Sequence, residues 1–176
     1  MGNNFLAYLQ QLEMVAFFSG YPLLYAVTLF IAGNQPVKNN FSSRISTLLP
    51  FAYALVGTLF LGLQLKNAYP DYSIVYFKET ILQPYLLIWG LLSILFWIPA
   101  LSKKTVISLI HSLVFFLLVI RNVFLQSAAS SVDKNMARNN MKIYTVSLLL
   151  NFGTFVFILL LSFLFGKYKK LKRVYK

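Results

Sequence analysis

Five long stretches with little or no charge constrain this chain more than any other feature of its sequence. Short charged connections separate them, and together they fill most of the 176 residues. A helix needs about 20 apolar residues to cross the roughly 30 Å hydrocarbon core of a bilayer. Because each stretch reaches or approaches that length, the sequence predicts an all-α membrane protein, a bundle of five transmembrane helices. The expected spans are residues 14–33, 46–66, 84–102, 105–126 and 143–166.

The composition agrees with a single transmembrane helical domain that occupies residues 1–176. Hydrophobic residues make up 59% of the chain, and the mean hydropathy of +0.70 is far above that of soluble proteins. The connections between the spans are too short to hold a second domain.

The formal net charge of +12 is concentrated at one end, because six of the 16 basic residues lie in residues 167–176, directly after the last span. A basic cluster in this position is typical of a cytoplasmic tail that contacts anionic lipid headgroups, with about 1 kcal/mol for each basic residue. We therefore expect membrane lipids rather than nucleic acid at the tail, and a specific protein partner is the alternative. The tail residues are Lys167, Lys169, Lys170, Lys172, Arg173 and Lys176.

The distribution of charge over the connections also predicts the topology. The first and third connections and the tail together hold ten basic and no acidic residues, whereas the other two connections are mixed. Since basic connections stay in the cytoplasm, the chain is expected to be N-out and C-in, in the plasma (inner) membrane of a bacterium. The alternative has four spans, with residues 105–126 in the membrane interface because Arg121 shortens their apolar run.

Polar residues recur at helical spacing in the last two spans. Polar side chains inside a span usually face the bundle interior or a wet cavity. The pattern therefore allows two interpretations, hydrogen bonding between helices or the lining of a pore. The residues are Ser147, Asn151, Thr154 and Ser162 in the last span, and Ser108, Ser112 and Asn122 in the span before it.

Two further patterns concern helix packing. Ala54, Thr58 and Gly62 are small residues four apart, and such a stripe lets another helix approach closely, inside one chain or between two copies. In the first span, Pro22 follows Ser19 and Gly20, and proline lacks the N–H of a helical hydrogen bond. The sequence therefore predicts a kink there, at which neighbouring helices can satisfy the freed carbonyl.

Apart from Lys66 at the very end of the second span, Arg121 is the only charged residue inside an expected span. At the proposed outer end of its span, its long side chain can reach the headgroups. The alternative is a pairing with an acidic residue near the same face, such as Glu13, Asp71 or Glu79.

The chain has few residues for catalysis. It has one histidine, no cysteine, and no carboxylate in the middle of a span. A zinc site or a proton-coupled carrier normally needs such groups. We therefore expect no cofactor, no metal, no catalytic residues and no enzymatic activity.

These observations favour a homo-oligomeric channel or pore lined by the polar stripes, which includes the case of a membrane-permeabilising effector. The second hypothesis is an accessory or scaffold subunit of a larger membrane complex, which docks through the small-residue stripe and the basic tail. The third is a lipid-handling carrier or enzyme, which the missing carboxylates disfavour.

Overall fold

The computed structural model describes residues 11–33, 40–69, 84–128 and 134–174, and this part of the chain is almost entirely helical and contains no strand. The long helices are α2 (Tyr21–Gly33), α3 (Asn40–Ala68), α7 (Thr105–Ala128) and α8 (Lys134–Val174). Shorter ones lie between α3 and α7, and they are α5 (Pro84–Leu92), the 3-10 helix η1 (Ser93–Trp97) and α6 (Pro99–Ser102).

In the part of the chain that the structure describes, four helical stretches are long and apolar enough to cross a membrane. They are Gln11–Ile31, Ile45–Asn67, Thr105–Phe124 and Met141–Phe165. They coincide, within a few residues, with four of the five expected spans. The stretch that the four-span alternative removes from the membrane, residues 105–126, is among these four.

The expected third span, residues 84–102, is not one continuous helix. Its apolar helix covers only Pro84–Trp97. Ile98 then has extended backbone, with φ −73° and ψ 123°, and α6 begins at Pro99. The cause is Pro99, because the ring of a proline disfavours helical backbone at the residue before it. The helical structure of the third expected span, residues 84–102, is therefore interrupted at Ile98.

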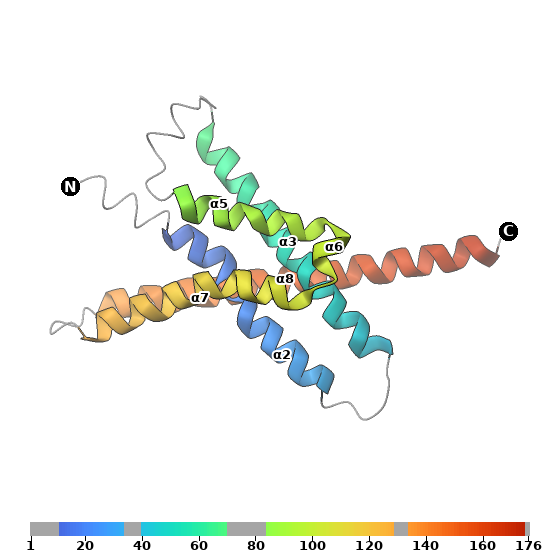
Figure 1. Cartoon of the computed structure of the whole chain (residues 1–176), viewed down its shortest axis with the longest axis horizontal. Helices are drawn as coiled ribbons and strands as arrows, with labels where there is room; N and C mark the ends of the chain where they lie inside the picture. The colour runs from blue at the N-terminus through green and yellow to red at the C-terminus, as the bar shows by residue number, and fades with distance from the viewer. Residues whose placement is uncertain (1–10, 34–39, 70–83, 129–133, 175–176) are drawn as a thin grey trace.

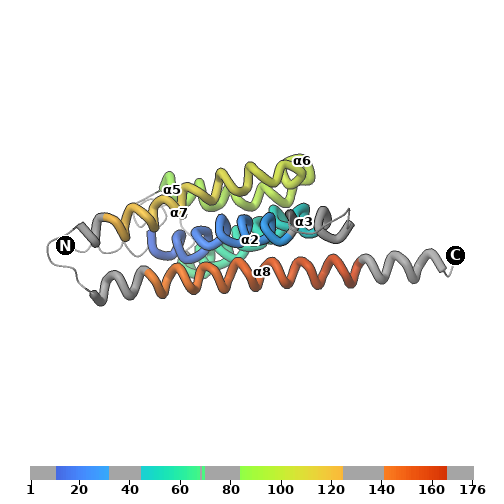
Figure 2. Tube along the Cα trace, turned by 90° about the horizontal axis from the view of Figure 1, so that it is seen from below, coloured from blue at the N-terminus to red at the C-terminus, as the bar shows by residue number. Residues whose placement is uncertain are grey.

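The helices run back and forth along one another. In Figure 1, α3, α5, α7 and α8 alternate in direction along the chain, and α5 with η1 runs beside α3. The edge-on view in Figure 2 shows α7 and α8 on opposite sides of a layer that contains α2 and α3. Helix α3 is the centre of the arrangement, since it packs against α2, α5, η1, α7 and α8.

Aromatic rings fill the core where the first span meets α3 and α7. Phe18 is fully buried and stacks on Phe115, with ring centroids 4.7 Å apart. It also meets the edge of Phe60 at 5.3 Å. Gly90 of α5 lies over this pair, and a Cβ atom there would come within 3.0 Å of Phe18. At this point the core thus consists of packed aromatic rings with Gly90 against them. Large apolar side chains such as Phe30 and Phe124 face outward.

Candidate functional site

The first span is interrupted near its middle. Residues 11–18 are helical, Ser19 and Gly20 form a turn, and α2 begins at Tyr21. The helix is therefore interrupted two residues before Pro22, at the place where the sequence predicts a kink. The hydroxyl of Ser19 donates to the carbonyl oxygen of Val15 at 2.6 Å and so completes the helical turn that ends there.

Helix α8 supplies hydrogen bonds to the backbone at this break. The N–H of Gly20 donates to Ser147 Oγ at 2.8 Å. Asn151 Nδ2 donates to the carbonyl oxygen of Phe17 at 2.8 Å, and also to that of Ser147 at 2.8 Å. A polar backbone group without a partner costs several kcal/mol in lipid. The last span therefore satisfies backbone groups of the first.

The two backbones touch at the same point. A Cβ atom on Gly20 would lie 2.7 Å from the carbonyl carbon and oxygen of Ser147 and from the amide nitrogen of Leu148. Only glycine allows this approach, because any side chain would collide with backbone rather than with a movable side chain. We call Gly20, Ser147 and Asn151 the helix-break cluster.

Most residues of the two predicted polar stripes lie inside the protein. Ser108, Ser112, Ser147, Asn151 and Thr154 are buried, whereas Asn122 and Ser162 are half-buried. The hydroxyls of Ser108, Ser112 and Thr154 each donate to the backbone carbonyl three residues earlier in their own helix, at 2.6–2.9 Å. The geometry of the buried residues therefore favours hydrogen bonding within and between helices over the lining of a pore.

A second polar cluster joins four helices around the lone histidine. Tyr21 and Ser108 share a hydrogen bond of 2.7 Å, and so do Tyr53 Oη and His111 Nδ1. Trp89 of α5 stacks on the His111 ring, with centroids 4.7 Å apart and planes 6° apart. Its Nε1 donates to the His111 carbonyl oxygen at 3.1 Å. Among the described residues, the buried Nε2 of His111 has no hydrogen-bond partner.

Sequence reasoning did not find this cluster. The sequence places His111 beside the polar stripe of its span, but no spacing rule relates it to Tyr53 or Trp89, which belong to other helices. The sequence did contain one indication of it, because tyrosines lie inside apolar spans. A buried tyrosine hydroxyl usually finds a hydrogen-bond partner.

The small-residue stripe is only partly used inside the chain. Ala54 is fully buried, but Thr58 is exposed, and no heavy atom of the described residues lies within 4 Å of the position of a Cβ on Gly62. The close approach on α3 occurs instead at Gly57, where a Cβ would overlap Ser93 Oγ. Among the described residues, the helix that packs closely on this part of α3 is η1, and it meets the neighbouring face at Gly57, not at Gly62.

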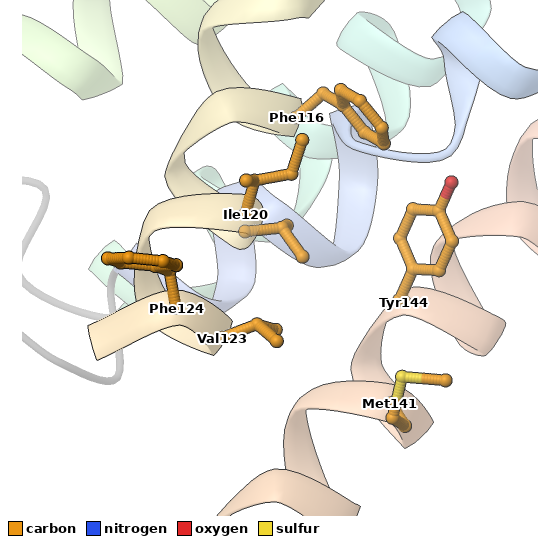
Figure 3. Close-up of a pocket in the computed structure, with 7 residues that line it drawn as sticks. Phe116, Ile120, Val123, Phe124, Met141 and Tyr144 are labelled. Atoms are coloured by element: carbon orange, nitrogen blue, oxygen red, sulfur yellow. The ribbon is translucent and has the colours of Figure 1, made fainter. Parts of the chain in front are cut away.

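Among the described residues, two apolar grooves open on the surface of the protein. The first, of about 450 Å³, lies between α7 and the start of the last span. Figure 3 shows Phe116, Ile120 and Val123 of α7 on one side and Met141 and Tyr144 of α8 on the other. We call it the α7–α8 groove.

The second groove, of about 410 Å³, lies between α3 and α8 and is called the α3–α8 groove. Leu55 and Leu59 form its α3 wall, and Gly153 lies in its α8 wall. Gly62 continues the row of Leu55 and Leu59 by helical spacing. As at Gly62, no heavy atom in the part of the chain that the structure describes lies within 4 Å of a Cβ position on Gly153. The surface around this groove is therefore open to a close neighbour.

The charged candidates are dispersed. Arg121 is exposed near the end of its span. Glu13 is half-buried and accepts a hydrogen bond of 3.3 Å from Gln64 Nε2. The side chains of residues 167–176, and the acidic residues Asp71 and Glu79, lie outside the described residues.

Comparison with known proteins found no matching family, no matching curated protein and no matching solved structure, so the function is argued from this geometry alone.

Proposed function

We propose that this chain is a non-enzymatic accessory subunit of a membrane complex, and that its α3–α8 groove holds a transmembrane helix of another membrane protein. One observation carries the proposal. The polar side chains that an internal pore would need are buried against the chain itself, whereas two apolar grooves open outward.

The channel hypothesis receives less support from the same residues. Ser147 and Asn151 already bond to the first span, so a lining role would require these bonds to break. A pore between copies would need polar faces that point outward. The outward faces of α8 are apolar instead, with Leu149, Phe152 and Leu160 more than half exposed.

The α3–α8 groove has the properties of a helix-docking surface. In membranes, helix association depends on close packing, and small residues let two backbones approach. Gly62 and Gly153 provide such positions, and no described residue of this chain covers either of them. Leucine side chains at the adjacent positions can interdigitate with those of a partner helix.

We also propose that the chain crosses the membrane five times, N-out and C-in. The helix Pro84–Trp97 is about 20–25 Å long. It is thus shorter than the roughly 30 Å hydrocarbon core, but long enough to cross most of it. It runs opposite to α3 and α7, so successive segments alternate in direction (Figure 1). Five crossings also leave the basic connections and the tail on one side.

A crosslinking experiment in native membranes tests the docking proposal. A photoreactive amino acid at Leu59, in the groove, should yield a discrete adduct with another membrane protein. The adduct should disappear when Gly153→Leu fills the groove, and persist in Phe152→Leu, which alters the exposed surface next to it. The same probe at Ile110, an exposed residue of α7, is the positional control.

Two other results would each support a different function for the chain. Adducts of Leu59 only with a second copy of the chain would indicate a homo-oligomer. Ion leak from liposomes that contain the purified chain alone would restore the channel hypothesis.

A further inference from the structure

His111 lies under the indole of Trp89, where α5 packs against α7. The imidazole is 7% exposed and the indole is 36% exposed, so Trp89 lies on the outer side of His111. The two rings are stacked at a centroid distance of 4.7 Å, with planes 6° apart, and Trp89 Nε1 donates to the His111 carbonyl oxygen. The indole of α5 therefore covers the one histidine of the chain.

The contacts of the His111 imidazole suit its neutral form. In neutral histidine one ring nitrogen accepts a hydrogen bond and the other donates one. Tyr53 Oη lies 2.7 Å from Nδ1, and a phenol that donates there leaves the ring proton on Nε2. Nε2 is buried, and no described residue accepts a hydrogen bond from it. The neutral ring therefore leaves one polar atom without a partner.

A second proton changes the contacts of the ring. Both nitrogens of an imidazolium donate hydrogen bonds and neither accepts one. Nδ1 would then face the Tyr53 hydroxyl as a donor, so the hydroxyl would have to direct its own proton elsewhere. Nε2 would still lack an acceptor, now with a positive charge on the ring. Protonation of His111 therefore reverses its bond to Tyr53 and creates no new one.

The described part of the chain supplies no counter-ion for a charge on His111. The titratable side chains at the cluster are the phenols of Tyr53 on α3 and of Tyr21 on α2, with ring centroids 4.4 Å apart. The carboxylate of Glu13 accepts a hydrogen bond from Gln64 instead, and it is the only carboxylate among the described residues. The other rings in contact with His111 carry no titratable group, and they belong to Trp89 of α5, Phe96 of η1 and Phe115 of α7.

Two opposing effects decide what a proton on His111 does to Trp89. The indole face attracts an imidazolium, but a buried charge without a counter-ion loses more than that when it leaves water. We propose that His111 and Trp89 form an acid-sensitive latch: neutral His111 holds the indole of α5 against α7, and protonation of His111 releases the indole, so that water reaches the imidazolium. Acid is the releasing condition, because a histidine buried in its neutral form takes up its proton as the pH falls. The latch does not depend on a partner in the α3–α8 groove.

Two signals from the full chain in phosphatidylcholine vesicles test the latch. Because the chain has one histidine, isotope-labelled histidine reports the protonation of His111 alone by NMR. The variant Trp97→Phe leaves Trp89 as the only tryptophan, and quenching of its fluorescence by acrylamide reports its contact with water. From about pH 8 down to about pH 4, a range around the pH of about 6.5 at which an exposed histidine titrates, the quenching should rise several-fold. This rise should share its midpoint with the imidazolium signal.

Two substitutions separate the latch from a general effect of acid. His111→Gln offers an amide oxygen to the Tyr53 hydroxyl and takes up no proton, so Trp89 should stay protected over the whole range. Glu13→Gln removes the described carboxylate and should leave the release unchanged. An imidazolium that forms while Trp89 stays protected, a ring that stays neutral throughout, or release that persists in His111→Gln would overturn the proposal. The first two results need no change at His111, so they hold even where that variant does not fold.

Discussion

Within the described residues, two breaks interrupt expected spans, and they are closed in different ways. The break at Ser19–Gly20 lies in the middle of the first span, and α8 satisfies its backbone groups through Ser147 and Asn151. The break at Ile98 closes on itself. Its N–H donates to the Leu95 carbonyl at 3.0 Å, and its own carbonyl accepts from two following amides at 3.0 and 3.1 Å.

The difference shows what position in a membrane requires. A break deep in the hydrocarbon has no water to satisfy it, so another helix must supply the partners. A break near the end of an apolar helix can use a local turn. The first break is closed by a hydrogen bond between residues 127 positions apart, whereas the hydrogen bonds at the second join residues close together in the sequence. Substitutions at the two breaks should therefore differ in cost.

The largest effect is expected for Gly20→Val. Its side chain would collide with the backbone of Ser147 and Leu148, which cannot move aside as a side chain can. Overpacking commonly costs about 1–3 kcal/mol, and this substitution should lie at or beyond the upper end. Thermal unfolding in detergent measures the loss. Gly153→Val adds the same atoms where the chain leaves open space, and should unfold like the wild type.

A smaller loss is expected for Asn151→Leu. It removes both bonds of the amide and leaves the Phe17 carbonyl without this donor. Because a hydrogen bond between membrane helices averages about 0.6 kcal/mol and an unpaired buried group adds to it, the cost should be about 1–2 kcal/mol. Unfolding titration in detergent gives the value. Asn122→Leu on α7, which is only half-buried, is the matched control, and an equal loss there would contradict the account.

Ser147→Ala should cost about 1 kcal/mol, because Gly20 N–H loses its acceptor while the shape of the contact is kept. Thr145→Ala is the control, since that exposed hydroxyl bonds only to the Met141 carbonyl of its own helix. A double-mutant cycle with Asn151→Leu should show coupling between Ser147 and Asn151, the two members of the cluster that α8 contributes. Strict additivity would mean that they act independently.

The smallest effect is expected for Pro99→Ala. The local hydrogen bonds around Ile98 come from the backbone, so the substitution should change stability by about 0.5 kcal/mol or less, as is usual for exposed positions. The same unfolding assay measures it. A loss as large as that of Asn151→Leu would show that the second break, too, is held by long-range contacts.

The sequence predicted most of the fold from two local signals. The length of the apolar runs located four spans to within a few residues, and Pro22 located the break in the first. The break at Ile98, near the end of the third expected span, was missed because the count of apolar residues gave no weight to Pro99. Each of these features depends on residues close together in the chain, which is why sequence patterns can show them.

The site was harder to predict because its members meet only through packing. The stripe that contains Ser147 and Asn151 was identified, but not its partner, since nothing in the sequence pairs α8 with the turn at Gly20. The small-residue pattern indicated Gly62, yet η1 meets α3 at Gly57. Which face of a helix is buried depends on the helices that pack against it, and the sequence of that one helix does not specify them.

The central claim is that the polar stripe of the last span satisfies a broken helix and does not line an aqueous path. Because the chain has no cysteine, a single Ser147→Cys variant tests it without background. We would treat sealed vesicles with a membrane-impermeant methanethiosulfonate from both sides, with Lys142→Cys at the exposed start of the span as positive control. The account predicts rapid reaction at position 142 and none at position 147 until the protein is unfolded. Rapid reaction at position 147 in the folded protein would contradict it.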